Sequence, residues 1–244
     1  MKYKVLSIKK SRIWFLLFFI VVGFIALQIP VNVLEGARVK FTLFDLFAPV
    51  SGAFLGSVFG ITAVFLMQVV NLLIHGFVGV QTDSILKLAA TLRFLPMAFG
   101  VWYFALRQAQ GKSSREKLIL IVPMAAIIAF NLHPVGKTVW FYSLFWFIPL
   151  LTWPLRQRFL VARSLGSTFT AHAVGGAVWI WAFNLPANVW ISLIPVVVLE
   201  RFIFALGLSA SYIFLNNVSA LLVKNRILAG VFSFDKKYVL RFLK

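Results

Sequence analysis

Four ionisable side chains fall near the middle of long apolar stretches, namely Arg93, His172, Glu200 and Arg201. A charged group in that setting costs about 2.5–3.5 kcal/mol on insertion scales, so it is typically paired or functional. Glu200 and Arg201 are adjacent, so we expect them to point about 100° apart on a helix and not to face each other. Glu200 is then expected to pair with Arg93 or His172. A buried ion-pair network that fixes helix register is one interpretation. For the whole set, a polar cavity that receives a ligand is favoured.

Asn71 lies at a similar depth in its apolar stretch, and Asp45 lies where it can balance a further cation. A second polar and aromatic group is expected at the helix ends opposite the most basic loops. Its members are His75, Asn131, His133, Lys137, Trp179, Trp181, Asn184 and Trp190. Rings with a few hydrogen-bonding groups suit a heteroaromatic or small polar ligand.

Parts of this second group have simpler interpretations. The tryptophans also suit an interface belt, and His133-Pro134 is typical of a helix cap followed by a turn. Trp179 and Trp181 are two apart and point to different sides of a helix, so we assign only Trp179 to the pocket. The substrate-binding set is therefore Asn71, His75, Arg93, Asn131, His133, His172, Trp179, Glu200 and Arg201.

Several other chemistries have no support in the sequence. The chain has no cysteine, which excludes disulfides and thiol chemistry, and its three histidines have no metal-binding spacing. Gly111-Lys112-Ser113 and Gly136-Lys137-Thr138 lack the earlier glycine of a phosphate-binding loop. We expect no catalytic residue, no metal and no cofactor, and predict that the chain is not an enzyme.

The composition of the chain indicates what kind of elements hold these residues. The 244 residues are 61% hydrophobic and 12% charged, whereas soluble domains are about 25% charged. A soluble protein of this size has too little interior for so many apolar side chains. We predict an all-α, polytopic transmembrane bundle of six to eight spans in the cell membrane, forming one domain over 1–244.

Apolar runs and loop charges predict where the spans lie. The eight segments are 13–30, 41–58, 61–79, 85–106, 118–132, 139–155, 165–183 and 190–214. A basic segment (1–12) precedes them, and a basic tail from about 224 to 244, partly an interfacial helix, follows.

The positive charges predict the orientation. Of 24 Lys and Arg residues, 18 lie at the N-terminus, in the loops 107–117 and 156–163, and from Lys224 onward. Only Arg38, Lys40, Lys87 and Lys137 lie in the opposite loops. This bias places both termini in the cytoplasm. Because the charges cluster in short loops next to apolar segments, they favour a bilayer over nucleic acid as the partner.

Gly52, Gly56 and Gly60 are spaced four apart, which on one helix lets another backbone approach closely. Packing inside the bundle is the favoured interpretation. A docking face for a partner membrane subunit is the alternative.

A family resemblance rests on Ile29-Pro30 and on Phe41-Thr-Leu-Phe-Asp-Leu-Phe-Ala-Pro-Val-Ser-Gly-Ala-Phe-Leu-Gly-Ser-Val-Phe-Gly60. Over roughly residues 13–106 the chain resembles the substrate-binding S components of energy-coupling factor (ECF) vitamin transporters. The resemblance implies a passive binder of a vitamin-like solute that works with a transmembrane coupling subunit and ATPase subunits. The family usually has six helices, and small residues four apart in its first helix, whereas here Gly23 and Ala26 are three apart.

Two other functions stay open. One is a stand-alone secondary transporter driven by protons through Glu200 and His172. The other is a membrane enzyme acting on lipid, or a scaffold for another complex.

Overall fold

The computed structural model describes residues 8–33, 40–76, 94–105, 114–224 and 234–241. Within these ranges the chain is predominantly helical, as predicted. The α-helices are α1 (Ile8–Leu27), α2 (Val50–Leu55), α3 (Ser57–Gly76), α5 (Phe94–Ala105), α6 (Ile121–Leu132), α7 (Pro134–Thr138), α8 (Ile148–Thr152), α9 (Leu160–Phe183) and α10 (Ala187–Lys224). The 3-10 helices are η1 (Leu43–Leu46), η2 (Ser114–Leu120), η3 (Trp140–Phe147), η4 (Trp153–Leu155) and η5 (Lys236–Tyr238).

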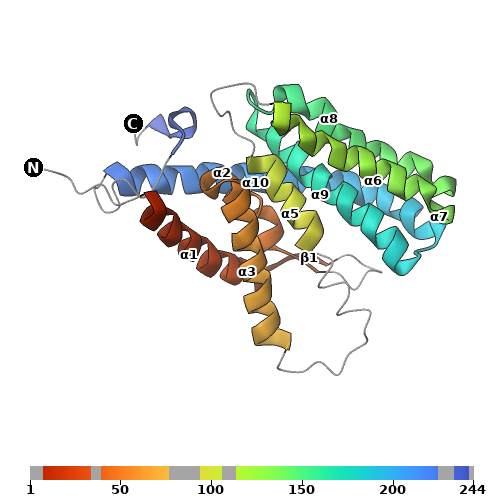
Figure 1. Ribbon diagram of the computed structural model, residues 1–244, viewed down its shortest axis with the longest axis horizontal. Coiled ribbons are helices and arrows are strands. Elements are labelled where there is room, and N and C mark those ends of the chain that lie inside the picture. Colours follow the sequence, from red (N-terminus) through yellow and green to blue (C-terminus); the bar gives the residue numbers. More distant parts are fainter. Residues whose placement is uncertain (1–7, 34–39, 77–93, 106–113, 225–233, 242–244) are drawn as a thin grey trace, which may run out of the picture.

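The helices form two groups, and α10 runs along both of them (Figure 1). The first group contains α1, α2, α3 and α5, which share an apolar core with the C-terminal half of α10. Phe19 of α1 stacks on Phe47 with centroids 4.8 Å apart, and Phe54 of α2 packs on Tyr212 of α10. These aromatic contacts explain why the short helix α2 is held inside the fold.

The second group contains α6, the η3–α8 segment, α9 and the N-terminal half of α10, which run up and down beside one another (Figure 1). Its core is largely aromatic. The ring of Phe130 lies 5.1 Å from that of Trp146 and 5.0 Å from that of Trp190. Tyr142 packs on the same Trp190 at 5.0 Å. Edge-to-face contacts of this kind stabilise a core beyond the area that they bury.

The two groups meet where α5 packs antiparallel to α9. Gly100, in the middle of α5, lies beside Ala171 of α9. Near the C-terminal end of α5, the Tyr103 hydroxyl donates to Pro149 O of α8 at 3.0 Å. The Tyr103 ring rests against Gly166, where a Cβ would lie 2.1 Å from its hydroxyl oxygen. The small residues of α9 therefore allow close packing on α5.

Several predicted segments differ from the structure in detail. Residues 139–155 form mostly 3-10 helix, with the single α-helical turn α8 between η3 and η4. Strand β1 (Pro30–Val33) pairs antiparallel with β2 (Lys40–Thr42), a small addition to the predicted all-α fold. Residues 85–93 of the fourth segment lie outside the described residues.

The last helix is longer than predicted, because α10 continues past residue 214 to Lys224. The amides of Asn216 and Asn217 do not end it. They bind the backbone of the C-terminal tail, where Asn216 accepts from Asp235 N at 2.6 Å and Asn217 accepts from Leu240 N at 2.8 Å. The described part of the tail contains the single turn η5, so the predicted interfacial helix is not seen in residues 234–241.

The interpretation of Gly52, Gly56 and Gly60 as one helix face is wrong. The helix breaks at Gly56, whose φ of 81° is a conformation that L side chains rarely adopt. Gly52 and Gly60 are buried against each other and against Val101 of α5. Their close approach serves packing inside the fold, which is the interpretation favoured from the sequence.

Among the described residues, one helix has the length and composition to cross a membrane by itself, namely α10. Shorter apolar helical stretches accompany it. They cover Ile13–Leu27, Ser57–Asn71, Phe94–Ala105, Lys117–Leu132 and Trp140–Leu155.

Candidate binding site in the helical bundle

His172 of α9 lies at the centre of a polar cluster in the second group of helices. Its Nδ1 accepts a hydrogen bond from Trp146 Nε1 at 3.2 Å, and its Nε2 lies 3.0 Å from the Tyr142 hydroxyl. The ring of Phe169 packs edge-on against the imidazole. Both polar partners come from η3, where the 3-10 helix turns Tyr142 and Trp146 toward α9.

The cluster fits because α9 is small on the side that meets η3. The indole of Trp146 lies against Gly176, where a Cβ would be 2.4 Å from the ring. Ala173, one turn earlier on α9, is fully buried. A larger side chain at Gly176 would push the indole away from His172. The small residues of α9 and the aromatic residues of η3 therefore together determine the hydrogen bond between Trp146 and His172.

Glu200 and Arg201 of α10 form an ion pair, which corrects the expectation that they point apart. Arg201 Nη2 lies 2.8 Å from Glu200 Oε2. The flexible stem of arginine folds its guanidinium back along the helix surface and bridges the angle between neighbouring positions. Arg201 Nη1 also donates to Thr168 Oγ1 of α9 at 3.3 Å, and the guanidinium lies over the Phe204 ring.

The second oxygen of this carboxylate is the unusual atom of the site. Glu200 is 6% exposed, and Glu200 Oε1 is buried with no hydrogen-bond partner among the described residues. An unsatisfied buried acceptor costs about 1–3 kcal/mol, more when it is charged. Such an atom calls for a donor that the described residues do not supply.

The ion pair and the histidine cluster belong to one site. Thr168, which accepts from Arg201, and His172 are four residues apart on α9 and so share one face of that helix. Three of the residues proposed from the sequence, His172, Glu200 and Arg201, are thus brought together in the interior of the bundle.

Other proposed residues have local roles at the end of the bundle marked by α7. Asn131 donates to Ser143 Oγ at 3.0 Å and ties α6 to η3. His133 caps α7 by accepting from Val135 N, as predicted for His133-Pro134. Trp181 packs on His133 and donates to Ala129 O. The aromatic contact of Trp179 is with Phe183 of its own helix, away from the His172 cluster.

The remaining proposed residues are not part of this cluster. Asn71 accepts from Gln28 Nε2 and ties α3 to α1 in the first group of helices. Asp45 caps η1 by accepting from Thr42 N at 2.8 Å. Arg93, and with it the proposed pairing of Arg93 with Glu200, lies outside the described residues, as does the side chain of His75.

Sequence reasoning missed Tyr142, Trp146 and Thr168. Tyr142 and Trp146 are four apart within the aromatic run of residues 140–147, a pattern that favours core packing over recognition. Thr168 is one of many small residues in α9. Only the spacing of Tyr142 and Trp146 on one side of a helix gave any sign that they act together.

No group of three or more metal-binding side chains occurs among the residues that the structure describes. Comparison of the chain with protein-family models, with curated proteins and with solved structures found no match. The resemblance to ECF S components therefore stays a prediction.

Proposed function

We propose that this chain is a multi-pass protein of the cell membrane that binds a small solute inside its helical bundle. The membrane location is supported by rows of exposed large apolar side chains spaced three or four apart, which a soluble protein rarely tolerates. On α1 the row is Trp14, Leu17, Phe18, Val21 and Ile25. On α10 it is Val198, Leu199, Phe202, Ile203 and Leu206.

The cytoplasmic placement of both termini is supported by where the cations gather. Lys237 of the tail donates to Arg158 O at 2.8 Å, so the tail and the α8–α9 connection lie at one end of the bundle. Arg163 binds Phe104 O at the same end. Lys137 lies in α7 at the opposite end (Figure 1). This distribution follows the positive-inside rule.

The observation that carries the binding proposal is the buried Glu200 Oε1 without a donor among the described residues. A solute with an N–H or O–H group satisfies this oxygen, and the rings of Tyr142, Trp146 and Phe169 provide an aromatic surface nearby. A heteroaromatic micronutrient combines these two features.

We further propose that the chain is the substrate-binding subunit of an uptake transporter. This step rests on the resemblance of residues 13–106 to S components, together with the lack of a complete phosphate-binding loop in the sequence. In this proposal a transmembrane coupling subunit and separate ATPases power release of the solute.

The hydrogen bond from Trp146 weighs against the alternative of a proton-coupled transporter that works through His172. The indole nitrogen is a donor only, so the bond requires an unprotonated Nδ1 on His172. An imidazolium carries protons on both ring nitrogens and loses this contact. Each protonation would therefore disrupt the packing of a fully buried tryptophan.

The test is ligand binding by the full-length protein in detergent. We expect thermal-shift screening with vitamins and related micronutrients, and mass spectrometry of co-purified molecules, to identify a ligand. Glu200→Gln should weaken its binding roughly tenfold or more, since a hydrogen bond to a charged acceptor contributes about 1.5–3 kcal/mol.

A control variant separates lost binding from general destabilisation. Tyr103→Phe removes hydrogen bonds to Pro149 O and Thr152. These bonds lie near the N-terminal end of α9, away from Glu200, so the variant should lower stability and leave ligand affinity unchanged. A wild-type protein that binds none of the screened solutes, or equal affinity of wild type and Glu200→Gln, contradicts the binding proposal. Failure of tagged protein to co-purify ATPase subunits from its native membrane contradicts only the transporter assignment.

A further inference from the structure

A groove open to the surface lies at the basic end of the bundle, away from the His172 cluster. It has a volume of about 570 Å³, within the range of about 300–1,000 Å³ that is usual for small-molecule sites. It lies between the α8–α9 connection, the first turns of α9, the C-terminal half of α10 and the tail. Its lining is Thr152, Leu155, Arg158, Phe159, Leu160, Val161, Ala162, Leu165, Ser209, Ile213, Lys237 and Tyr238.

The groove combines apolar walls with positive charge. Most of its lining is aliphatic or aromatic, and its two charged residues, Arg158 and Lys237, are both cations that are exposed. Lys237 is held over the groove by its bond to Arg158 O. The nearby carboxylate of Asp235 accepts from the backbone N of Lys237 and caps η5. The groove therefore has apolar walls and carries two cations at the protein surface.

Two neighbouring arginines are committed to the protein itself. The Arg156 guanidinium stacks on Trp153 at 3.3 Å and donates to Trp153 O. Arg163 binds Phe104 O and lies over the Phe104 ring. Arg158, whose guanidinium lies 5.2 Å from the centre of the Phe159 ring, is placed to meet a ligand. So is Lys237, because its ammonium group has three donors and uses one of them on Arg158 O.

The start of α9 adds to the positive potential. Leu160, Val161 and Ala162 are its first three residues, and their N–H groups have no acceptor within the helix. Phe159 provides no side-chain cap. A helix start of this kind favours anions, here next to two cationic side chains.

We propose that this groove binds one anionic phospholipid of the cytoplasmic leaflet. An acyl chain would lie along the apolar wall formed by Leu155, Leu165 and Ile213, and the phosphate would contact Arg158 and Lys237. The assignment rests on the proposed membrane location but not on solute binding at Glu200. Apolar walls suit the acyl chain, and the cations suit a negative headgroup and not a neutral one.

Native mass spectrometry of the full-length protein in detergent tests this site. The probes are phosphatidylglycerol and phosphatidylcholine with identical acyl chains. We expect one phosphatidylglycerol to be retained with roughly tenfold or greater preference, as two surface cations suffice for that difference. The double variant Arg158→Gln/Lys237→Gln should reduce the preference to about that of a neutral groove, near onefold.

Two further variants distinguish a defined site from general attraction. Lys236→Gln/Arg241→Gln also removes two exposed cations, both in the tail and outside the groove lining, and should keep the preference. Val161→Trp, at a lining position that is 37% exposed, should reduce retention of both lipids by filling the groove.

Three results of the lipid measurements overturn the proposal. They are equal retention of both lipids by the wild type, an unchanged preference in Arg158→Gln/Lys237→Gln, and an equal loss in Lys236→Gln/Arg241→Gln. Glu200→Gln should keep the preference for phosphatidylglycerol. That result would show that lipid binding in the groove does not depend on solute binding at Glu200. Co-purification of a partner membrane helix in place of lipid, with no phosphatidylglycerol retained, also overturns it.

Discussion

Trp146 donates its indole N–H to Nδ1 of His172, across 3.2 Å in the core of the bundle. The donor has no lone pair to offer, so this bond assigns the remaining imidazole proton to Nε2, which faces the Tyr142 hydroxyl. One contact thereby sets the tautomer of the histidine and the hydrogen-bonding role of the tyrosine.

His172→Ala should destabilise the protein, because it leaves the buried Trp146 N–H and Tyr142 hydroxyl without this partner. We expect a loss of about 1–3 kcal/mol for each unsatisfied group in the free energy of unfolding, measured by SDS titration of the detergent-solubilised protein. Trp146→Phe should be coupled to it, so that the double variant loses less than the sum of the two single changes. If the losses of the two single variants simply add in the double variant, the hydrogen bond between Trp146 and His172 is contradicted.

Glu200→Gln and Arg201→Gln should each lower the free energy of unfolding by about 3–5 kcal/mol, because each leaves an uncompensated charge inside the bundle. The double variant should be more stable than their sum predicts, and the difference measures the pair. Lys224→Gln changes an exposed cation at the end of the same helix and should have little effect. If both single variants unfold like the wild type, the two side chains are not paired.

Gly52→Ala distinguishes internal packing from docking on a partner. Its Cβ would lie 2.5 Å from Val101 O, so we expect a loss of about 1–3 kcal/mol in the isolated protein. Gly175→Ala is the matched control, because its Cβ would be 3.5 Å from Pro96, an ordinary contact. A Gly52→Ala protein that is stable alone but no longer binds a membrane partner would favour the docking interpretation.

The topology is testable because the chain contains no cysteine. We expect Lys137→Cys to react with a membrane-impermeant maleimide in intact cells, and Lys236→Cys to react only after permeabilisation. Both side chains are exposed, so access to the reagent, and not burial, decides the labelling. The reverse pattern would place the basic end outside and contradict the predicted orientation.

The helices were predictable because apolar runs end at charged loops. The predicted segments 41–58 and 61–79 imply a break between them, and the structure has one close by, at Gly56. The end of α10 was not predictable, since Asn216 and Asn217 resemble a polar helix end. Their backbone partners lie far along the chain in the tail, and no local pattern reports such a contact.

The site was predictable in part. The sequence identified His172, Glu200 and Arg201 because ionisable groups are rare in such apolar surroundings. The pairing of the last two depended on how the arginine side chain folds back, which sequence spacing does not determine. Tyr142 and Trp146 were missed because aromatic residues are so frequent here that their four-residue spacing stands out little.

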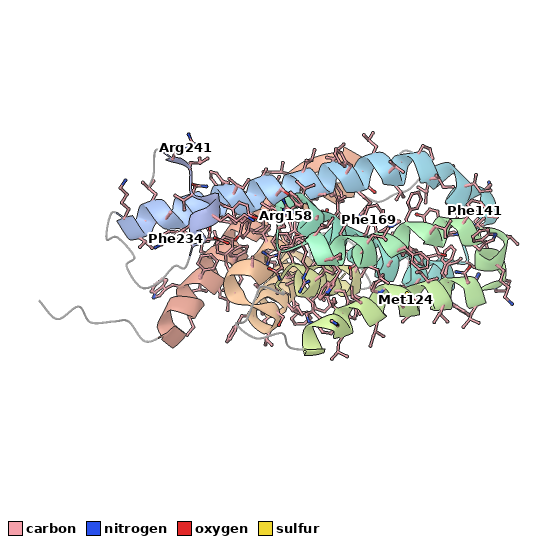
Figure 2. All side chains as sticks on the ribbon, turned by 90° about the horizontal axis from the view of Figure 1, so that it is seen from above. Met124, Phe141, Arg158, Phe169, Phe234 and Arg241 are labelled. Atoms are coloured by element: carbon pink, nitrogen blue, oxygen red, sulfur yellow. The ribbon has the colours of Figure 1, made fainter. Side chains whose placement is uncertain are left out.

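If the protein lies in a membrane as proposed, the length of α10 bears on the kind of bilayer that suits it. Its 38 residues extend for roughly 57 Å at about 1.5 Å per residue, nearly twice a typical hydrocarbon core of about 30 Å. Such a helix crosses at a slant or projects into the headgroups, and a thinner bilayer demands more tilt. Figure 2 shows α10, in blue, running along both groups of helices. Because Trp190 lies in one apolar core and Tyr212 in the other, tilting α10 would displace both at once. In the proposed membrane, bilayer thickness would therefore act as a mechanical input to the fold.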